Sequence, residues 1–360
     1  MKAAVLREVD APLTIEDVQI DSPGPNEVVV RTVASGVCHS NLHYMEGKYT
    51  FPLPTVLGDE AAGVIEAVGS MVTYVKPGDH VITCLSVFCG VCDKCLSGNP
   101  HLCRRKGMER LPGEPPRLRQ NGDVIHQFSF LSTFAEYMLV HENATCKIRE
   151  DVPLEEVALI GCAVTTGVGA ALNTAKVAPG STVAVLGLGG IGLSALQGAV
   201  LAGAERIIAI DTIETKLALA RELGATDVVD ASGGGAVEKV LGLSPRGVDY
   251  SFEAIGLKET AEQAYNMLDT GGLATVIGMI PEGTMIHIDG PSLLSERRIG
   301  GSSMGSNRFR IDMPRYIELY LQGRLKLKEM ISQQMRLDEV NKAFDDMKEG
   351  HVARSVLTFN

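Results

Sequence analysis

The stretch "VAVLGLGGIG", Val183 to Gly192, decides the fold of the second half of the chain. It begins as a buried strand and continues into Gly187, Gly189 and Gly192 in G-x-G-x-x-G spacing, directly before a helical pattern. Glycines in this context allow a tight turn and the close approach of a pyrophosphate, and the helix amino terminus offers unpaired N–H groups. The stretch predicts a dinucleotide site formed by Gly187, Gly189, Gly190, Ile191 and Gly192. A turn that serves only helix–strand packing is the alternative.

The residues beyond the turn indicate which dinucleotide is bound. The strand-like "RIIAID" ends in Asp211, 19 residues after Gly192, where a carboxylate can accept hydrogen bonds from the adenosine ribose. The same carboxylate would repel the 2′-phosphate of NADP, and the following "TIE" contains no arginine to accommodate it. Lys216 either supports the ribose or is a solvated helix lysine. The sequence therefore predicts NAD as the cofactor.

Strands and helices alternate through this half of the chain, which predicts parallel βαβ units and a doubly wound sheet of the α/β class. The expected strands are 182–188, 206–211, 227–230, 248–256 and 272–279, and the expected helices are 191–204, 215–224 and 258–268. The earlier part is β-rich instead, with strands expected at 2–8, 13–20, 27–35, 61–69 and 80–85 between Pro, Gly and Asn turns. Two helices, 313–325 and 337–350, and a strand, 354–359, are expected to close the chain.

Residues 104–123 are rich in Pro, Gly and Arg and show no periodicity, so a long loop is expected. It is either a solvated surface excursion or a rim that shapes access to a site, because long ordered loops in compact domains are often functional.

Composition excludes several classes of protein. The 360 residues are enough for two domains, and a net charge of -11 argues against nucleic acid as a partner. The sequence has no apolar stretch of signal-peptide length near its start and none of roughly 20 residues that would span a bilayer. We therefore expect a cytoplasmic protein without a membrane partner.

Four of the eight cysteines form the series "CGVCDKCLSGNPHLC". Four thiolates so close in the chain can wrap one tetrahedral zinc, and an all-cysteine shell leaves no position for a substrate, which indicates a structural site. An iron–sulfur cluster is the competing interpretation, although it usually wants a proline after the fourth cysteine. Disulfides are least expected in a cytoplasmic chain. The four residues are Cys89, Cys92, Cys95 and Cys103.

Several motifs in order along the whole chain resemble the zinc-dependent medium-chain dehydrogenases. They are this cysteine series, "ASGVCHSNLH", "GDEAAGVIEAVG", "LIGCAVTTGVGAAL", "GLGGIG" and the terminal "RSVLTF". The closest branch is the liver-type alcohol dehydrogenases and their formaldehyde-oxidising relatives. The resemblance implies a GroES-like catalytic domain from residues 1–163 and 305–360, with a zinc lobe at about 89–103. It also implies a Rossmann NAD-binding domain from residues 164–304.

The resemblance implies a second, catalytic zinc with one departure from the family pattern. Cys38 and Cys162 match the two cysteine ligands, and Glu60 matches a glutamate that lies behind the metal and can approach it when water is exchanged. The third ligand in the family is a histidine, and this chain has Asp59 in its place. Aspartate is a competent zinc ligand, so an open tetrahedral site of Cys38, Asp59, Cys162 and a water is expected; the alternative is that Asp59 binds no metal and the site is degenerate.

Asn41 differs from the family in a way that suits this change. The family usually has an aspartate here, which accepts a hydrogen bond from the histidine ligand. A carboxylate ligand needs a donor instead, and an asparagine amide can donate. The two differences have the form of a compensated pair.

The remaining site residues are also assigned by resemblance. Ser40 matches the hydroxyl that takes the proton of the alcohol, and His43 matches the histidine that receives it by way of the nicotinamide ribose. His39 and Arg354 match residues that contact the cofactor phosphates, Arg354 also contacting the glutamate behind the zinc. The substrate pocket is expected to be bordered by Tyr49, Leu85, Phe128 and Ser129.

The resulting prediction is an oxidoreductase with NAD and two zinc ions, one catalytic and one structural. It would interconvert a small primary or aromatic alcohol and its aldehyde as a homodimer or homotetramer, both of which are common in the family. Two alternatives stay open. One is an NAD(P)H-dependent carbonyl or conjugated-alkene reductase without the catalytic zinc, and the other is a non-catalytic relative that only binds the cofactor.

Overall fold

The computed structural model describes residues 1–104, 108–111, 113–350 and 352–359. Two compact units are present. The first comprises Met1–Cys162, Arg308–Gly323 and Leu327–Asn360, and the second comprises Ala163–Asn307 with Arg324–Lys326. The sequence predicts a catalytic domain of residues 1–163 and 305–360 and a cofactor domain of residues 164–304. This assignment of functional domains stays a prediction.

The second unit is built on a parallel sheet of six strands in the order β14-β13-β12-β15-β16-β17. Its strands are β12 Thr182–Leu186, β13 Arg206–Asp211, β14 Asp227–Asp230, β15 Val248–Glu253, β16 Leu268–Val276 and β17 Arg298–Gly301. Its helices are α4 Ala163–Gly169, α5 Gly190–Ala202, α6 Glu214–Glu222, α7 Ala236–Leu243 and α8 Lys258–Asn266. The predicted α/β class with a doubly wound sheet is confirmed.

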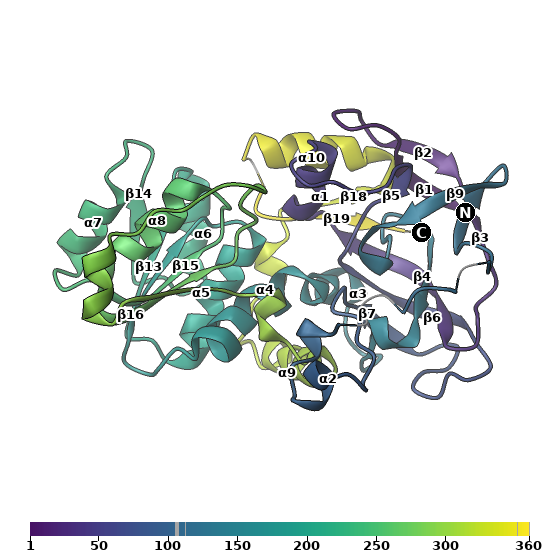
Figure 1. Cartoon of the computed structure of the whole chain (residues 1–360), viewed down its shortest axis with the longest axis horizontal. Helices are drawn as coiled ribbons and strands as arrows, with labels where there is room; N and C mark the ends of the chain where they lie inside the picture. Colours follow the sequence, from purple (N-terminus) through teal and green to yellow (C-terminus); the bar gives the residue numbers. More distant parts are fainter. Residues whose placement is uncertain (105–107, 112, 351, 360) are drawn as a thin grey trace. The chain divides into compact units, whose positions relative to one another are not determined.

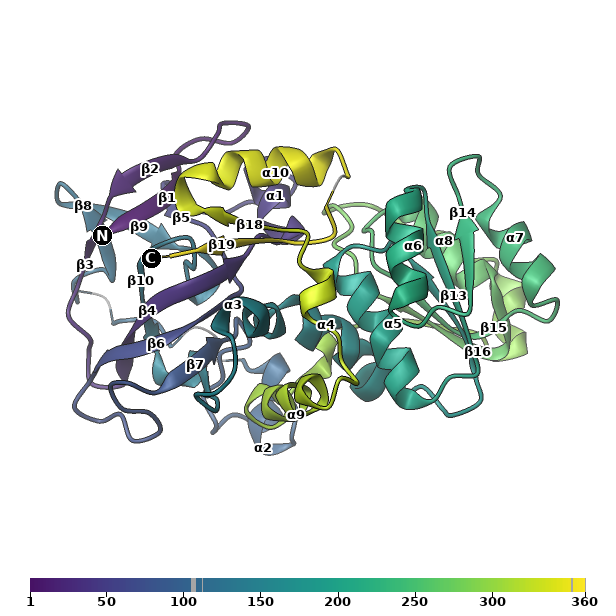
Figure 2. The same cartoon turned by 180° about the vertical axis from the view of Figure 1, so that it is seen from behind.

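Helices cover both faces of this sheet, with α5 and α6 on one face and α7 and α8 on the other (Figures 1 and 2). The chain reverses direction across the sheet after β14, so β12 and β15 lie side by side in the centre. Crossovers between parallel strands are right-handed, which is why the two directions of winding place their helices on opposite faces. In such sheets the crevice for ligands forms at the carboxyl ends of the strands where the winding reverses.

The first unit is β-rich and contains two sheets. Their orders are β2-β1-β5-β9-β8-β3 and β11-β7-β6-β4-β19-β18, with β10 also paired to β4. The amino-terminal strands are β1 Lys2–Leu6, β2 Thr14–Asp17, β3 Gln19–Ile20, β4 Glu27–Gly36, β5 Thr55–Val56, β6 Ala61–Val68 and β7 His80–Thr83. The later strands are β8 Leu118–Gln120, β9 Asp123–Gln127, β10 Tyr137–His141, β11 Thr145–Lys147, β18 Gln333–Arg336 and β19 Ser355–Thr358. The helices are α1 His39–Met45, α2 Asp93–Leu96, α3 Leu154–Val157, α9 Phe309–Leu321 and α10 Val340–Lys348.

Both ends of the chain build this unit. Strand β19 pairs antiparallel with the end of β4, with Val356 opposite Gly36. Leu42 and Met45 of α1 share an apolar cluster with Val340 and Phe344 of α10, and both views show these helices side by side (Figures 1 and 2). The last residues of the chain are therefore part of the core on which α1 rests.

Some elements differ from the sequence prediction. The single strand expected over 13–20 is broken into β2 and β3, and the helix expected at 313–325 starts earlier, as α9. Helices α1, α2, α3, α4 and α7 are not among the elements expected from the sequence. Helix α4 is buried on all sides and shows no polar face. A helix buried all round lacks the amphipathic period that sequence reasoning depends on.

The long loop expected at 104–123 is mostly irregular but includes β8, and its residues 105–107 and 112 lie outside the described part. Arg110 and Arg117 anchor it, because both donate hydrogen bonds to the buried carboxylate of Glu27 on β4. Among the described residues, no single helix is long and apolar enough to cross a membrane, although the segments 154–161 and 163–175 together pass that test of length and composition.

Candidate metal centres and cofactor turn

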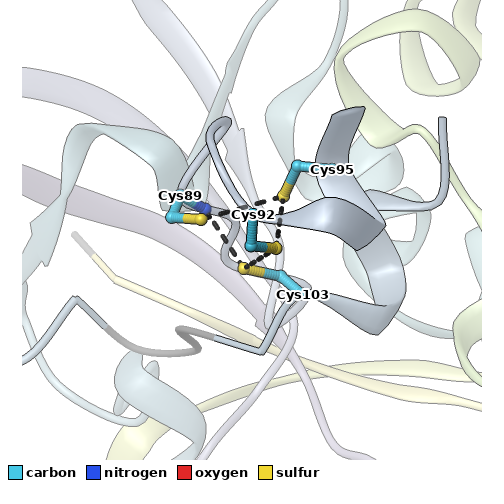
Figure 3. A group of neighbouring side chains, drawn as sticks. All are labelled: Cys89, Cys92, Cys95 and Cys103. Atoms are coloured by element: carbon cyan, nitrogen blue, oxygen red, sulfur yellow. Dashed lines mark hydrogen bonds between the residues drawn. The ribbon is translucent and has the colours of Figure 1, made fainter. Parts of the chain in front are cut away.

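The four cysteines of the lobe lie together around α2: Cys89 and Cys92 precede the helix, Cys95 is in it and Cys103 follows it. Figure 3 shows their sulfur atoms directed toward one another. The sulfur of Cys92 lies 3.5 Å from that of Cys95 and 3.8 Å from that of Cys103, and Cys89 lies 4.0 Å from Cys95. None of the eight cysteines is in a disulfide.

These distances fit a tetrahedral metal. Zinc bound at about 2.3 Å by four thiolates sets neighbouring sulfurs about 3.8 Å apart. An iron–sulfur cluster inserts several atoms between its cysteines and would hold them farther apart. Backbone N–H groups of Cys95 and Arg104 lower the pKa of Cys92 to about 6, so this thiol ionises readily. The four residues that the sequence predicted as ligands are thus brought together in a form suited to zinc.

A second group of potential ligands lies inside the first unit. Ligand atoms of Cys38, Asp59 and Cys162 all lie within 4.8 Å of one another, and all three side chains are buried. Cys38 precedes α1, Asp59 lies between β5 and β6, and Cys162 is the last residue of the first segment of this unit. The fold therefore brings together three residues that are far apart in the sequence.

Asp59 is held by two hydrogen-bond donors. The hydroxyl Oγ of Ser40 donates to Asp59 Oδ2 at 2.7 Å, and the amide Nδ2 of Asn41 donates to Asp59 Oδ1 at 3.1 Å. The hydrogen bond from Asn41 to Asp59 that the sequence suggested is confirmed. Each carboxylate oxygen keeps a lone pair beyond these contacts, so the group remains able to bind a metal.

The charges of this cluster fit a cation. Burial, and then the neighbouring Cys38, raise the pKa of Asp59 to about 8. The hydrogen bond from Cys162 holds the pKa of Cys38 well below its usual range, while that of Cys162 lies well above. Three acids in one buried place oppose one another's ionisation, and a divalent cation removes that opposition. Two sulfurs and one oxygen are a suitable donor set for zinc with an open fourth position.

Glu60 lies outside this group of ligand atoms and is paired with Arg354. The guanidinium donates to both carboxylate oxygens, with 3.2 Å from Nε to Oε1, and both residues are buried. Gly36 makes room for this pair, because a Cβ there would lie 1.8 Å from Glu60 Oε1. Sequence reasoning did not single out Gly36, since a glycine required by a close contact looks like any other in the sequence.

The glycine turn has the form that the sequence predicted. Gly187 has φ of +87°, and a Cβ on Gly192 would lie 1.7 Å from Gly187 O, so both positions require glycine. A Cβ on Gly189 would meet nothing within 4 Å, which leaves space for a ligand over the start of α5 formed by Gly190 and Ile191. Asp211 Oδ2 accepts a hydrogen bond from the backbone N–H of Leu188 at 2.7 Å, so it also holds the turn. Lys216 lies half-buried on α6.

Glu253 is a further residue at this edge that sequence reasoning missed. It is buried at the end of β15, where Oε1 accepts hydrogen bonds from Ile255 N, Gly256 N and Thr260 Oγ1. Its other oxygen, Oε2, is buried without a hydrogen-bond partner in the described structure. The available signal in the sequence was an acidic residue at the end of the expected strand "VDYSFE".

His43 is buried on α1, and His39, at the start of the helix, is exposed with its ring 5.1 Å from that of His43. Burial, and then the charges of His39 and Lys48, lower the pKa of His43 to about 4. Its Nδ1 atom is buried and has no hydrogen-bond partner among the described residues. A neutral imidazole with an unsatisfied nitrogen is suited to a polar group supplied by a ligand.

The four residues expected at the substrate pocket lie in different surroundings. Tyr49 borders a small cavity of about 100 Å³ beside Tyr44 and Phe51. Phe128 is a core residue whose ring lies 4.8 Å from that of Tyr44. Leu85 packs against another apolar cluster, and Ser129 is half-buried with φ of +49°.

Because the buried imidazole of His43 is neutral, replacing it should change how the free energy of unfolding depends on pH. The pKa of His43 is lower in the folded state than its ordinary 6.5, so its contribution to stability is complete above pH 6.5 and is lost as the pH falls toward 4. His43→Gln is expected to lose less unfolding free energy than the wild type between pH 7 and pH 4.5 in denaturant titrations. His287→Gln, at an exposed site, is the control and is expected to match the wild type. Equal acid sensitivity of all three proteins would contradict this reading of His43.

Comparison with known proteins places the chain in a family. A model described as "Alcohol dehydrogenase GroES-like domain" matches residues 24–150, and one described as "Zinc-binding dehydrogenase" matches residues 190–322. The chain is 39% identical to "Alcohol dehydrogenase class-3" of Dictyostelium discoideum, over 99% of this chain and 97% of that protein.

Two solved structures are similar over almost the whole chain. The benzyl alcohol dehydrogenase of Acinetobacter calcoaceticus is 34% identical with a TM-score of 0.92, covering 100% of this chain and 99% of its own. A zinc-binding dehydrogenase of Sinorhizobium meliloti 1021, solved with NADP, is 30% identical with a TM-score of 0.82, covering 99% of each chain. The chain therefore belongs to the zinc-dependent alcohol dehydrogenases of the medium-chain dehydrogenase family.

Proposed function

We propose that the protein is an NAD-dependent alcohol dehydrogenase that interconverts a primary or aromatic alcohol and its aldehyde, with two zinc ions per chain. The observation that carries the proposal is the buried group of Cys38, Asp59 and Cys162, with the Ser40 hydroxyl bonded to Asp59. Zinc held there would supply a Lewis acid for the alcohol oxygen, and bound NAD would supply the hydride acceptor. The second zinc would be structural and held by Cys89, Cys92, Cys95 and Cys103.

The side chains on α1 are proposed to handle the proton of the alcohol. Ser40 donates its one hydroxyl hydrogen to Asp59 and keeps a lone pair that can accept a hydrogen bond from a substrate hydroxyl. When Ser40 takes the proton of the substrate, its own hydrogen would leave Asp59 and pass by way of the ribose of bound NAD toward His43. His43 is neutral at physiological pH and is the proposed acceptor, and because its pKa is low it would pass the proton on to water. Glu60 and Arg354 form a buried ion pair behind the ligands. The positive charge of Arg354 is therefore close to the cluster and is neutralised by the carboxylate of Glu60.

We assign residues 1–163 and 305–360 as the GroES-like catalytic domain and residues 164–304 as the NAD-binding domain. The two compact units support this assignment, although they divide after Cys162 and Asn307 and the second also takes Arg324–Lys326. The space above Gly189 and the amino terminus of α5 support a pyrophosphate at Gly187, Gly189, Gly190, Ile191 and Gly192. Asp211 and Lys216 are proposed at the adenosine ribose, and His39 and Arg354 at the phosphates. A cytoplasmic location belongs to the proposal and is supported by the eight free cysteines.

The substrate class is proposed from chemistry and similarity together. The similar protein of Acinetobacter calcoaceticus is named a benzyl alcohol dehydrogenase, and aromatic side chains cluster around α1 in this chain. Tyr49, Leu85, Phe128 and Ser129 remain the proposed pocket border, although Phe128 contributes from the core. Benzyl alcohol is therefore the first substrate to assay.

Metal content and turnover together test this proposal. The purified protein is expected to contain two zincs per chain by elemental analysis and to form NADH from benzyl alcohol. Asp59→Ala is expected to retain one zinc and to lose about a thousandfold or more in kcat/KM, because a Lewis acid contributes several kcal/mol to the transition state. Asp345→Ala, at an exposed site, is the matched control and is expected to keep both zincs and full activity.

Other outcomes would favour the alternatives. One zinc per chain with NAD(P)H-dependent reduction of carbonyls or conjugated alkenes would identify a reductase without the catalytic zinc. Cofactor binding without turnover of any alcohol or aldehyde would identify a non-catalytic relative.

Cofactor choice is tested at Asp211. The wild type is expected to prefer NAD over NADP by at least about tenfold in kcat/KM, because the carboxylate repels a 2′-phosphate. Asp211→Ser removes that repulsion. It should reduce the ratio of kcat/KM for NAD to kcat/KM for NADP, mainly by lowering the KM for NADP. A wild type that prefers NADP, the cofactor present in the similar Sinorhizobium protein, would contradict the assignment.

A homodimer or homotetramer is proposed as the working form. Among the described residues, β17 pairs only with β16, so its other edge is open. Met285, Leu293 and Leu294, which come shortly before β17 in the sequence, are 72%, 52% and 90% exposed. An open strand edge and exposed apolar side chains are both features that a second copy can cover. Sedimentation equilibrium is expected to give two or four chains per particle, and a monomer at micromolar concentration would contradict it.

A further inference from the structure

We propose that Asn41 is a positioning residue that makes this site accept a carboxylate, and not an imidazole, as the third metal ligand. The inference rests on the proposed function, because it presumes a metal between Cys38, Asp59 and Cys162. It concerns a residue that lies behind the ligand rather than one that binds the metal.

The orientation of the Asn41 amide is determined by its surroundings. Asn41 is 0% exposed and lies on α1, three residues after Cys38. Its Oδ1 accepts a hydrogen bond from the backbone N–H of Gly58 at 2.7 Å. A backbone N–H can only donate, so the oxygen of the amide has to face Gly58 and the NH₂ group has to face away from it.

The NH₂ group consequently faces Asp59. Nδ2 lies 3.1 Å from Asp59 Oδ1, and its distances to Cys38 O and Ser40 Oγ are longer, at 3.5 and 3.4 Å. Ser40 holds the other oxygen, Oδ2, at 2.7 Å. Two donors on two oxygens fix the plane of the carboxylate, which is the way outer residues orient metal ligands.

The peptide group that orients Asn41 is itself held in place. Gly58 has φ of +98°, and a Cβ there would lie 2.3 Å from Thr133 Oγ1 and 2.6 Å from Phe134 N. Gly58 O accepts a hydrogen bond from Thr133 N–H at 3.1 Å, and Leu57 O accepts one from Phe134 N–H at 3.0 Å. The Gly58 N–H therefore cannot turn away to let the amide of Asn41 reverse.

These constraints exclude a good histidine site at position 59. A histidine that binds metal through one ring nitrogen carries a hydrogen on the other and needs an acceptor behind it. Asn41 presents a donor there, and reversing its amide would direct the NH₂ group at the Gly58 N–H. An aspartate at position 41 could accept from both groups. Asn41 is thus matched to Asp59, and each single exchange should be worse than the double exchange.

The test is a double-mutant cycle on zinc affinity with Asn41→Asp, Asp59→His and the combined variant. Zinc is withdrawn from each zinc-loaded protein by graded chelator, and site occupancy is measured by the protection of individual cysteines from alkylation. Each single substitution is expected to weaken zinc at Cys38 and Cys162 by about 10- to 100-fold. The combined variant is expected to bind at least tenfold more tightly than either single variant. Effects that simply multiply in the combined variant would overturn the proposal.

Two internal comparisons separate this role from general damage. Protection of Cys89, Cys92, Cys95 and Cys103 should be equal in all four proteins, since the side-chain hydrogen bonds of Asn41 go to Cys38, Ser40, Gly58 and Asp59 and not to that group. Asn41→Leu keeps the approximate size of the side chain but removes its hydrogen-bonding groups, and it should weaken zinc at Cys38 and Cys162 about tenfold. Unchanged affinity in Asn41→Leu would overturn the proposal even if the histidine variants do not fold. Wild-type Cys38 and Cys162 that are unprotected before any chelator is added would contradict the proposed function itself.

Discussion

The hydrogen-bonded carboxylate of Asp59, buried between two thiols, is the interaction on which the site depends. A buried charge is costly unless it is paired and hydrogen-bonded, and Asp59 is 2% exposed. Four separate segments meet that requirement: α1 supplies Ser40 and Asn41, the Gly58 turn directs the side chain, residues 133–134 hold the turn, and Cys38 with Cys162 supply the partners for a shared cation. The hydrogen bonds of Ser40, Asn41 and Gly58 thus stabilise a carboxylate that would otherwise be costly to bury.

The ion pair of Glu60 and Arg354 extends this arrangement to the far end of the chain. Arg354 comes directly before β19, and β19 completes the sheet beside β4, which leads to Cys38. The ligand-bearing loop is therefore supported by residues nearly 300 positions away in the sequence. The exchange of histidine for aspartate also changes the charge, because two thiolates with a neutral imidazole balance a divalent ion and two thiolates with a carboxylate leave one negative charge. A more negative site should raise the pKa of a bound alcohol relative to a site with histidine. This ligand set therefore goes with a more alkaline optimum for alcohol oxidation.

Motifs with short-range geometry were predictable from the sequence. The glycine turn, the four-cysteine lobe and the alternation of strands and helices each depend on residues close together in the chain, and each is present in the structure. Features set by tertiary packing were not predictable in the same way. Helix α4 lacks a polar face, and Gly36 is required by a side chain 24 residues later. Asn41 shows both sides: its donor role followed from chemistry, but the Gly58 N–H that enforces it is visible only in three dimensions.

An anomalous difference map at the zinc edge, from crystals of the purified protein, would decide whether Asp59 is a zinc ligand. We expect a peak bonded to Cys38, Asp59 and Cys162, with Asn41 Nδ2 still within hydrogen-bonding distance of the aspartate, in addition to a peak inside the four-cysteine lobe. A peak in the lobe alone, or a metal at Cys38 and Cys162 from which the Asp59 carboxylate is turned away, would contradict it.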